Sequence, residues 1–398
     1  MAALKAAGTR ELGREFIVFP NGGSPMFIAR GLMDTDFVMF EKSHGEYGTH
    51  PGLVLSPVIE GVTLRAYNDN IFEHKFVQCL RRRVRPIILS RAGYPRRPPW
   101  RMLNANTARL GMAECGAFSG GGGFLLRPKF GVYHDAMNAY RRFFETHPSL
   151  YAGLDSHADV AVLACPEQGV LHNAAHKASV QALTRELAKA HVLFDYVSEP
   201  SLTEATLRRY KAVVATELRV VSDPQLLAIT RYVEKGGRLV VVGSFATLDD
   251  ALADRKHVAA DGAQGRGAVR RCPTVQAVPG VLGAAMSALA CPNKQLGPHV
   301  KVNAFRTLGN EPGRLVVHVV NYNVPLGVNA KPPTTIDGIE LSVPLPKGTR
   351  ASSARVFAPD AAEAVPVAVA TREGKARLGL PTLHIYRVVE LTLAQLNR

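Results

Sequence analysis

Several features of common protein classes are missing from this sequence of 398 residues. No stretch approaches the roughly 18 consecutive apolar residues that a membrane-spanning helix needs. The first residues include no apolar segment of signal-peptide length, so we expect a cytoplasmic protein. The few cysteines form no CxxC pair, which argues against a disulfide framework or a cysteine-based zinc site and fits a reducing compartment. They are Cys79, Cys115, Cys165, Cys272 and Cys291.

Acidic residues are also scarce, with 33 against 48 basic residues, which gives a net charge of +15. The basic residues are scattered, apart from one cluster at Arg81, Arg82, Arg83 and Arg85. No aromatic-rich RNA motif, zinc-finger spacing or basic helix accompanies this charge, as a nucleic-acid-binding protein would require. The composition therefore favours a solvated, arginine-rich surface, with no nucleic-acid or membrane partner.

The first region of the chain, to about residue 156, alternates short apolar runs with helical segments. Runs at Phe16–Phe19, Phe37–Phe40 and Pro86–Leu89 predict strands, and Gly116–Phe124 predicts a fourth. Helical stretches are predicted over 62–83, over 104–114 and after residue 134. Consecutive β-α units predict parallel strands with right-handed crossovers, and four of them make half of a (β/α)8 barrel.

The second region has the pattern of a doubly wound parallel sheet, either flavodoxin-like or Rossmann-like. Capping-box patterns at Ser201–Glu204 and Ser222–Gln225 predict two helix starts. The Gly- and Ala-rich residues 249–297 are predicted to be an irregular tail of this region. The predicted strands are Asp159–Ala164, Val192–Val197, Ala212–Ala215 and Leu239–Val242.

From about residue 299 the strands are short and are separated by Gly, Pro and Asp turns, which predicts an antiparallel β-sandwich. The sequence therefore predicts an α/β multidomain fold. A partial (β/α)8 barrel is expected over 1–156, a doubly wound domain over 157–298 and a β-sandwich over 299–398. The predicted strands of the last region are Leu315–Val320, Ile339–Val343, Ala354–Phe357, Val365–Val369, Ala376–Leu380 and His384–Leu391.

Several short sequence segments resemble the C-terminal part of family 42 β-galactosidases and related glycosyl hydrolases. Residues 135–147, followed by Pro-Ser-Leu-Tyr-Ala-Gly at 148–153, resemble the last barrel helix and its exit. Residues 210–214 and 232–240 resemble the trimerisation domain, which has a class I glutamine-amidotransferase-like fold. Residues 317–322 and 357–360 resemble the terminal β-sandwich. The resemblance implies a carbohydrate-acting protein without a cofactor that forms a homo-oligomer, either a trimer or a dimer.

The same resemblance implies that half of the catalytic barrel is absent from this chain. In these barrels the general acid/base glutamate follows the fourth strand, and this chain begins after that point. The family 42 nucleophile follows strand seven, where this sequence has Pro86–Leu89 and then Ser90-Arg91, without a carboxylate. Glu41, after the apparent sixth strand, resembles a glutamate found there in less characterised related hydrolases.

Glu41 is the main candidate for a catalytic carboxylate, because the end of a strand fixes its direction. Glycoside hydrolysis needs two carboxylates, roughly 5–5.5 Å apart for retention or 6.5–9.5 Å apart for inversion. Glu46 and Glu114 are weaker candidates for the second one. Glu41 has the alternative role of a substrate hydrogen-bond acceptor or an arginine partner. Polar and aromatic residues near strand ends or loops suit sugar binding, although they are equally common in turns. They are Asn21, His44, Tyr67, Asn68, Asp69, Arg91 and Tyr94.

Other motifs favour structural roles. Asp69 also fits a helix start, and His44 with His50 lacks a third metal ligand at suitable spacing. The run Gly120–Gly123 lacks the Lys-Ser/Thr of a phosphate loop, so a flexible barrel loop is expected. An amidotransferase nucleophile would be a cysteine where Thr216 and Glu217 stand, so that domain is expected to be catalytically silent. Cys165 is expected to be a packed thiol.

The sequence thus predicts a glycoside-hydrolase-like protein that acts on or binds carbohydrate and is incomplete as a catalyst on its own. If it is active, another chain or an upstream segment supplies the second carboxylate. The alternative is a non-catalytic pseudo-glycosidase that serves as a carbohydrate-binding or oligomerisation module. A half-barrel would leave sheet edges and inner apolar surface uncovered, which predicts self-association.

Overall fold

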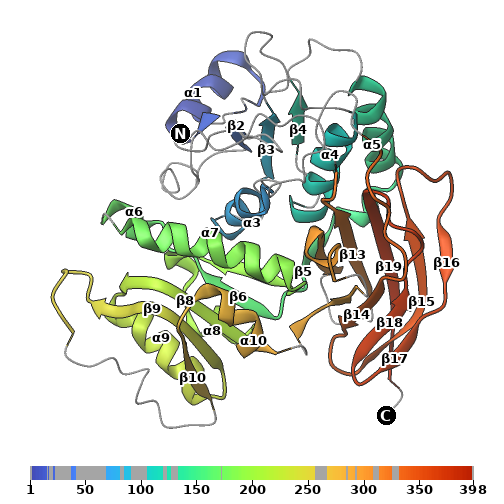
Figure 1. Ribbon diagram of the computed structural model, residues 1–398. Helices are drawn as coiled ribbons and strands as arrows, with labels where there is room; N and C mark the ends of the chain where they lie inside the picture. Colours follow the sequence, from blue (N-terminus) through green and yellow to red (C-terminus); the bar gives the residue numbers. More distant parts are fainter. Residues whose placement is uncertain are drawn as a thin grey trace.

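The computed structural model describes residues 2–15, 17, 21–22, 37–41, 69–80, 85–90, 105–119, 123–126, 133–171, 173–255, 267–283, 286–291, 294–307, 313–324 and 331–396. Figure 1 shows three layered parts. A four-stranded parallel sheet with its helices lies at the top, a five-stranded parallel sheet lies at the lower left, and two antiparallel sheets lie at the right. The mixed α/β architecture is the one that the sequence predicts.

The four-stranded sheet is parallel throughout, in the order β1-β2-β3-β4. Along the chain α3 lies between β2 and β3, α4 lies between β3 and β4, and α5 follows β4, as consecutive β-α units require. The strands are β1 (Asn21–Gly22), β2 (Phe37–Glu41), β3 (Arg85–Ser90) and β4 (Gly123–Leu126). The helices are α1 (Ala2–Leu12), α3 (Ile71–Leu80), α4 (Ala105–Ser119) and α5 (His134–Thr146). The strand predicted over 16–19 falls outside the described residues, except for position 17, which belongs to no regular element.

The prediction of a strand over Gly116–Phe124 is wrong in its first part, because α4 continues to Ser119. Every residue from Leu110 to Ser119 is buried, since α3, α5 and strand β13 (Arg314–Asn321) all contact this helix. A helix that is covered on all sides has no single apolar stripe. Its last turns therefore could not be distinguished from a buried strand.

The five-stranded sheet is parallel and has the order β7-β6-β8-β9-β10. In chain order this is 2-1-3-4-5, the flavodoxin-like arrangement, so the structure selects one of the two predicted topologies. The strands are β6 (Val160–Leu163), β7 (Phe194–Val197), β8 (Ala212–Val220), β9 (Arg238–Leu248) and β10 (Ala268–Cys272). Strand β10 corrects the prediction that 249–297 is irregular: its short Ala-Val-Arg-Arg-Cys run has little apolar patterning.

Side chains of this sheet alternate between two apolar cores, as strand geometry requires. On β6, Val160 and Val162 pack in the core that includes α7 (Ala174–Lys189), whereas Leu163 packs in the core that includes α9 (Asp223–Glu234). Figure 1 shows α7 and α9 on opposite faces of the sheet. The shorter helices of this part are α6 (Glu167–Val170), α8 (Glu204–Leu207) and α10 (Val278–Leu282). The 3-10 helices of the described chain include η3 (Pro148–Leu150), η4 (Glu199–Ser201), η6 (Val275–Ala277) and η8 (Gly297–His299).

One predicted capping box is confirmed and one is wrong. At α9 the Ser222 backbone N–H donates to Gln225 Oε1 over 3.0 Å, and the reciprocal bond completes the box. At α8 the cap is Thr203 rather than Ser201, because Thr203 Oγ1 accepts from the Thr206 backbone N–H over 3.2 Å.

The remaining strands form two antiparallel sheets, with orders β16-β15-β19-β13-β12-β5 and β11-β14-β18-β17. Strand β5 precedes the parallel sheet in sequence but pairs with β12, so the chain joins the antiparallel sheet before it enters the parallel one. The six strands of the predicted β-sandwich are confirmed with shifted ends, and β12 and β17 are additional. The bounds are β5 (Leu154–Ser156), β11 (Leu289–Ala290), β12 (Val300–Thr307), β14 (Glu340–Pro344), β15 (Thr349–Phe357), β16 (Val365–Val367), β17 (Ala370–Arg372), β18 (Lys375–Gly379) and β19 (Tyr386–Gln395).

The six-stranded sheet is covered on both faces. On β13, Val317 and Val319 pack in the core between the two antiparallel sheets, whereas Val316 and Val320 pack with α4 and α5. His318 lies on the second face, and its Nδ1 is 2.7 Å from the Tyr386 hydroxyl. One continuous apolar core therefore joins the helices of the four-stranded sheet to the antiparallel sheets.

His318 should make the protein sensitive to acid. Its imidazole is fully buried, and burial lowers its pKa from 6.5 to about 3. Between pH 6.5 and pH 3 the imidazole is protonated in the unfolded chain but not in the folded one. The stability that depends on His318 is therefore fully present above pH 6.5 and is lost as the pH falls toward 3. The full loss is about 5 kcal/mol.

Urea denaturation at a series of pH values measures this dependence. His318→Gln should flatten the acid limb by about 1.4 kcal/mol per pH unit, while the exposed His384→Gln leaves it unchanged. An acid limb with the same slope in His318→Gln and in the wild type would contradict this assignment.

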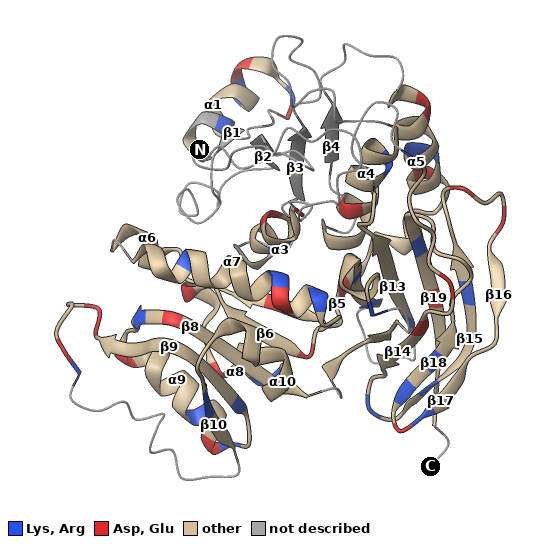
Figure 2. Ribbon diagram, in the orientation of Figure 1, with Lys and Arg blue, Asp and Glu red and all other residues tan. Residues whose placement is uncertain are grey.

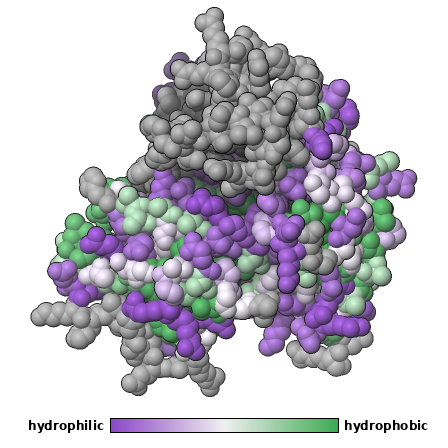
Figure 3. All heavy atoms as spheres, in the orientation of Figure 1, coloured by the Kyte–Doolittle hydropathy of each residue, from purple (hydrophilic) through white to green (hydrophobic). Residues whose placement is uncertain are grey.

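Charge on the described surface is mixed (Figure 2), with basic residues on α9, β15 and β18 and acidic residues interspersed. Many charges sit in short local pairs, such as Arg141 with Glu145 at 3.1 Å and Lys189 with Glu186 at 2.9 Å. Such exposed pairs contribute little to stability. Hydrophilic side chains are spread over the visible described face (Figure 3), which fits the predicted solvated surface.

Candidate functional site

The carboxyl ends of β2, β3 and β4 lie together at one edge of the four-stranded sheet, here called the β2–β4 edge. The strand registers pair Glu41 with Leu89, and Ser90 with Leu126. Asn21 of β1 pairs with Met39, two residues before Glu41. In parallel α/β sheets the loops at this edge carry the ligand-binding groups. The backbone of Glu41 is therefore where the sequence predicts it, while the side chains of Glu41 and Asn21 lie outside the description.

Most of the other predicted site residues lie outside the described residues. Their meeting with Glu41 stays a prediction. They are His44, Glu46, Tyr67, Asn68, Arg91 and Tyr94.

Glu114 is described in full and occupies a closed position inside the protein. Its side chain is completely buried between α3, α4 and the end of β13. Oε2 accepts hydrogen bonds from the Asn70 backbone N–H at 3.0 Å and from the Tyr322 hydroxyl at 2.5 Å. Oε1 lies 3.5 Å from His74 Nε2. Burial, and then the neighbouring carboxylate, raise the pKa of Tyr322 well above its usual value, so its hydroxyl keeps the proton that it donates.

Asp69 takes the helix-start position that the sequence offered as its alternative role. Its Oδ1 accepts from the backbone N–H of Ile71, the first residue of α3, at 3.4 Å. Burial raises the pKa of Asp69 to about 6, and the positive charge of Lys301 opposes that rise. Burial likewise lowers the pKa of Lys301 to about 8. Asp69 is thus part of a polar cluster with Glu114 and Lys301, where the start of α3 meets β12 and the end of β13.

Sequence reasoning missed the rest of this cluster: His74, Lys301 and Tyr322. The sequence did contain a sign of these residues, because His74 interrupts the apolar face of α3 and Lys301 interrupts an apolar strand. Buried polar groups at such positions are almost always hydrogen-bonded, so each needed a partner. Nothing in the sequence alone could place Glu114 beside Tyr322, since the two residues are 208 positions apart along the chain.

At the switch point of the five-stranded sheet, between β6 and β8, side chains of α7 and of the residue before it bond to the backbone. His176 of α7 is fully buried there: Nε2 accepts from the Cys165 backbone N–H at 3.0 Å, and Nδ1 donates to the Thr216 carbonyl at 2.7 Å. The Asn173 amide donates to the Glu217 carbonyl at 2.8 Å. Ligands of doubly wound sheets bind in the crevice at such a switch point. The buried His176 ring links the backbone after β6 to the backbone of β8 at this position.

Glu217, where an amidotransferase would have its nucleophile, adopts a left-handed backbone conformation with φ of 47°. Its carboxylate accepts from the Ser244 backbone N–H at 3.2 Å and lies against Gly243, whose φ is 67°. Cys165 is buried, and burial raises the pKa of its thiol well above the usual value, which disfavours the nucleophilic thiolate.

Within the described residues, no group of three or more His, Cys, Asp or Glu side chains could hold a metal ion. His44 and His50 lie outside them. None of the helices in the described part of the chain is both long and apolar enough to span a bilayer.

No protein-family model matches this sequence, and no curated protein matches it significantly. Solved structures do match. A catalytic mutant of Gan42B, a GH42 β-galactosidase from G. stearothermophilus, gives a TM-score of 0.61 at 10% identity, over 96% of this chain and 65% of that one. A β-galactosidase from Bacillus circulans sp. alkalophilus gives 0.57 at 10% identity, over 92% and 61%. An α-L-fucosidase, isoenzyme 2 from Paenibacillus thiaminolyticus, gives 0.53 at 12% identity, over 78% and 61%.

The chain therefore has a fold similar to that of GH42 β-galactosidases, which confirms the predicted resemblance at the level of architecture. It spans less than two thirds of the length of each of these three proteins.

Proposed function

We propose that this protein is a glycoside-hydrolase-like protein that binds carbohydrate at the β2–β4 edge and is incomplete as a catalyst on its own. The observation that carries the proposal is the position of Glu41. It ends a strand of a parallel sheet, beside two further strand ends, in a chain with a GH42-like fold. The GH42-like fold suggests a carbohydrate site at this edge, and the end of β2 positions Glu41 there.

We propose that the site at Glu41 is not complete without a second carboxylate supplied from elsewhere. Hydrolysis needs a pair of carboxylates across the glycosidic bond. Strand β3 ends in Leu89 and Ser90, neither of which is acidic. Glu114 has its oxygens engaged by Asn70 and Tyr322, so we assign it a structural role. Glu46 stays a candidate from the sequence. A second chain or an upstream segment would supply the partner, and self-association of this chain stays a prediction.

Carbohydrate titration and hydrolysis, measured side by side, test the proposal. The purified chain should bind at least one monosaccharide, and Glu41→Gln should weaken that binding, because a carboxylate accepts stronger hydrogen bonds from hydroxyls than a neutral amide does. On a panel of aryl glycosides the chain alone should show no turnover.

The control is Glu340→Gln, which changes an exposed carboxylate on β14. Turnover by the isolated chain that is lost in Glu41→Gln would show a complete enzyme and refute the incomplete site. Turnover that survives in Glu41→Gln would remove Glu41 from catalysis. Sugar binding without turnover supports the pseudo-glycosidase form of the proposal.

A further inference from the structure

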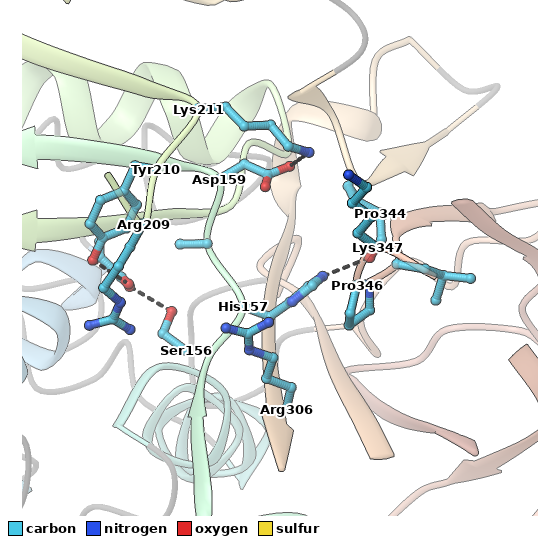
Figure 4. Close-up of a pocket in the computed structure, with 13 residues that line it drawn as sticks. Ser156, His157, Asp159, Arg209, Tyr210, Lys211, Arg306, Pro344, Pro346 and Lys347 are labelled. Atoms are coloured by element: carbon cyan, nitrogen blue, oxygen red, sulfur yellow. Dashed lines mark hydrogen bonds and ion pairs between the residues drawn. The ribbon is translucent and has the colours of Figure 1, made fainter. Parts of the chain in front are cut away.

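A pocket of about 230 Å³ lies where the five-stranded sheet meets the antiparallel sheets (Figure 4). One wall is formed by Arg209, Tyr210 and Lys211, which precede β8, and the other by residues 344–347, which include the turn after β14. His157 and Arg306 lie between these walls in Figure 4. None of the described residues that line this pocket comes from the β2–β4 edge.

A rigid hydrogen-bond frame supports the pocket. Asp195 accepts from the Ser156 hydroxyl at 2.8 Å and from the Tyr210 hydroxyl at 3.2 Å. His157 Nε2 lies 2.6 Å from the Pro344 carbonyl oxygen, which ties the segment before β6 to the end of β14. Burial lowers the pKa of His157, so the ring is neutral at pH 7 and donates this bond. The walls are therefore held in place without a ligand.

The two acidic residues of the lining are already neutralised. Asp159 Oδ2 pairs with Lys211 Nζ at 2.8 Å. Asp195 Oδ1 lies 3.5 Å from Lys75 Nζ, in addition to the hydroxyl donors of the frame. Neither carboxylate is left to balance a further cation.

Two cations of the lining, Arg306 and Lys347, form no ion pair within the described part of the chain. Arg209 also lines the pocket, but its charge is paired with Asp155 at 3.1 Å. Burial is the largest cause of the lowered pKa of His157, and the positive charges of Arg306 and Lys211 lower it further. The described lining therefore has an excess of positive charge.

We propose that this pocket binds a small oxyanion, a phosphate or carboxylate group carried on a compact polar molecule. Arg306 and Lys347 would contact the anionic group with charge-assisted hydrogen bonds. Since liquid water occupies about 30 Å³ per molecule, the pocket has room for roughly eight waters, which suits a small metabolite rather than a polymer. The bound anion would bridge the two parts that form the walls and so stabilise their arrangement.

Calorimetric titration with inorganic phosphate, glycerol 3-phosphate and gluconate tests this site, with neutral glycerol as the uncharged comparison. At least one anion should bind, and raising the salt concentration from about 0.05 to 0.5 M should weaken it. The double variant Arg306→Gln, Lys347→Gln should lower the affinity about tenfold or more. Binding of the two phosphates alone would identify a phosphate ligand, and binding of gluconate would extend the site to carboxylates.

The matched control is Arg219→Gln, an exposed arginine near the opposite end of β8, which should leave the affinity within about twofold. Both residues of the double variant are exposed, so its melting temperature without ligand should equal that of the wild type. Absence of binding by every anion at about 10 mM in low salt, or equal binding by the double variant, would overturn the proposal. Neither result bears on sugar binding at Glu41.

Discussion

Tyr386→Ala should lower the free energy of unfolding by about 3–5 kcal/mol, the cost of removing a large buried aromatic side chain. Tyr386 begins β19 and is almost completely buried, and it is among the largest fully buried side chains of the described chain. Its ring stacks on Tyr140 of α5, with centroids 6.2 Å apart, and on His318 at 6.0 Å. The substitution would thus open a cavity between the six-stranded antiparallel sheet and helices α4 and α5.

The groups around Tyr386 are close-packed, so they are not expected to move in and fill that cavity. Its hydroxyl lies 3.1 Å from the Tyr151 hydroxyl and 2.7 Å from His318 Nδ1. Gly116 of α4 passes so close that a Cβ there would lie 2.8 Å from the Tyr386 oxygen. Helix α4 therefore carries a glycine at a buried helical position, where alanine is otherwise preferred, because the tyrosine needs the space.

Equilibrium denaturation in urea measures the effect, with Tyr386→Phe as the matched control. The phenylalanine variant keeps the ring and loses only the hydroxyl, so its loss should be about 1–2 kcal/mol. A loss below about 1 kcal/mol for Tyr386→Ala would mean that the two parts do not depend on this contact.

Glu114→Ala should also be severe, with a loss of about 3–5 kcal/mol. Removing the carboxylate leaves the Tyr322 hydroxyl and the Asn70 backbone N–H without the acceptor that they share. Both donors are buried, and a buried donor that loses its partner keeps the full cost of desolvation. Sugar binding should be unaffected in any variant that still folds, since we assign Glu114 a structural role.

The double variant Glu114→Leu, Tyr322→Phe separates these effects from simple loss of volume. It fills the site and removes the stranded hydroxyl together with its acceptor, so part of the stability should return. Glu145→Ala, at an exposed position on α5, should cost less than about 0.5 kcal/mol. If Glu114→Ala were as mild as this control, the carboxylate would have no structural role.

Much of the fold could be predicted because local patterns carried it. Strands such as β6 and β9 are apolar runs of the right length, and the Ser222–Gln225 box opens α9 as predicted. Strand β10 could not be predicted from such a run, because an edge strand with two adjacent arginines has no apolar pattern to detect. The last turns of α4 were not predicted as helix, because a helix that is buried on every side has no apolar stripe with the helical period.

The candidate site was less predictable, because it depends on contacts between distant segments. The strand end at Glu41 follows from a local run, so its backbone position could be predicted. The engagement of Glu114 by Tyr322 joins residues 208 positions apart, and no local pattern encodes it. The oxyanion pocket likewise combines residues 156–159, 209–211 and 344–347, which only the folded chain brings together.

Isothermal titration with a panel of monosaccharides, on the wild type, Glu41→Gln and Glu340→Gln, tests carbohydrate binding at the β2–β4 edge most directly. We expect at least one sugar to bind the wild type and Glu340→Gln with equal affinity, and to bind Glu41→Gln about tenfold more weakly or worse. Equal affinity in all three proteins, or no binding of any sugar to the wild type, would contradict a carbohydrate site at Glu41.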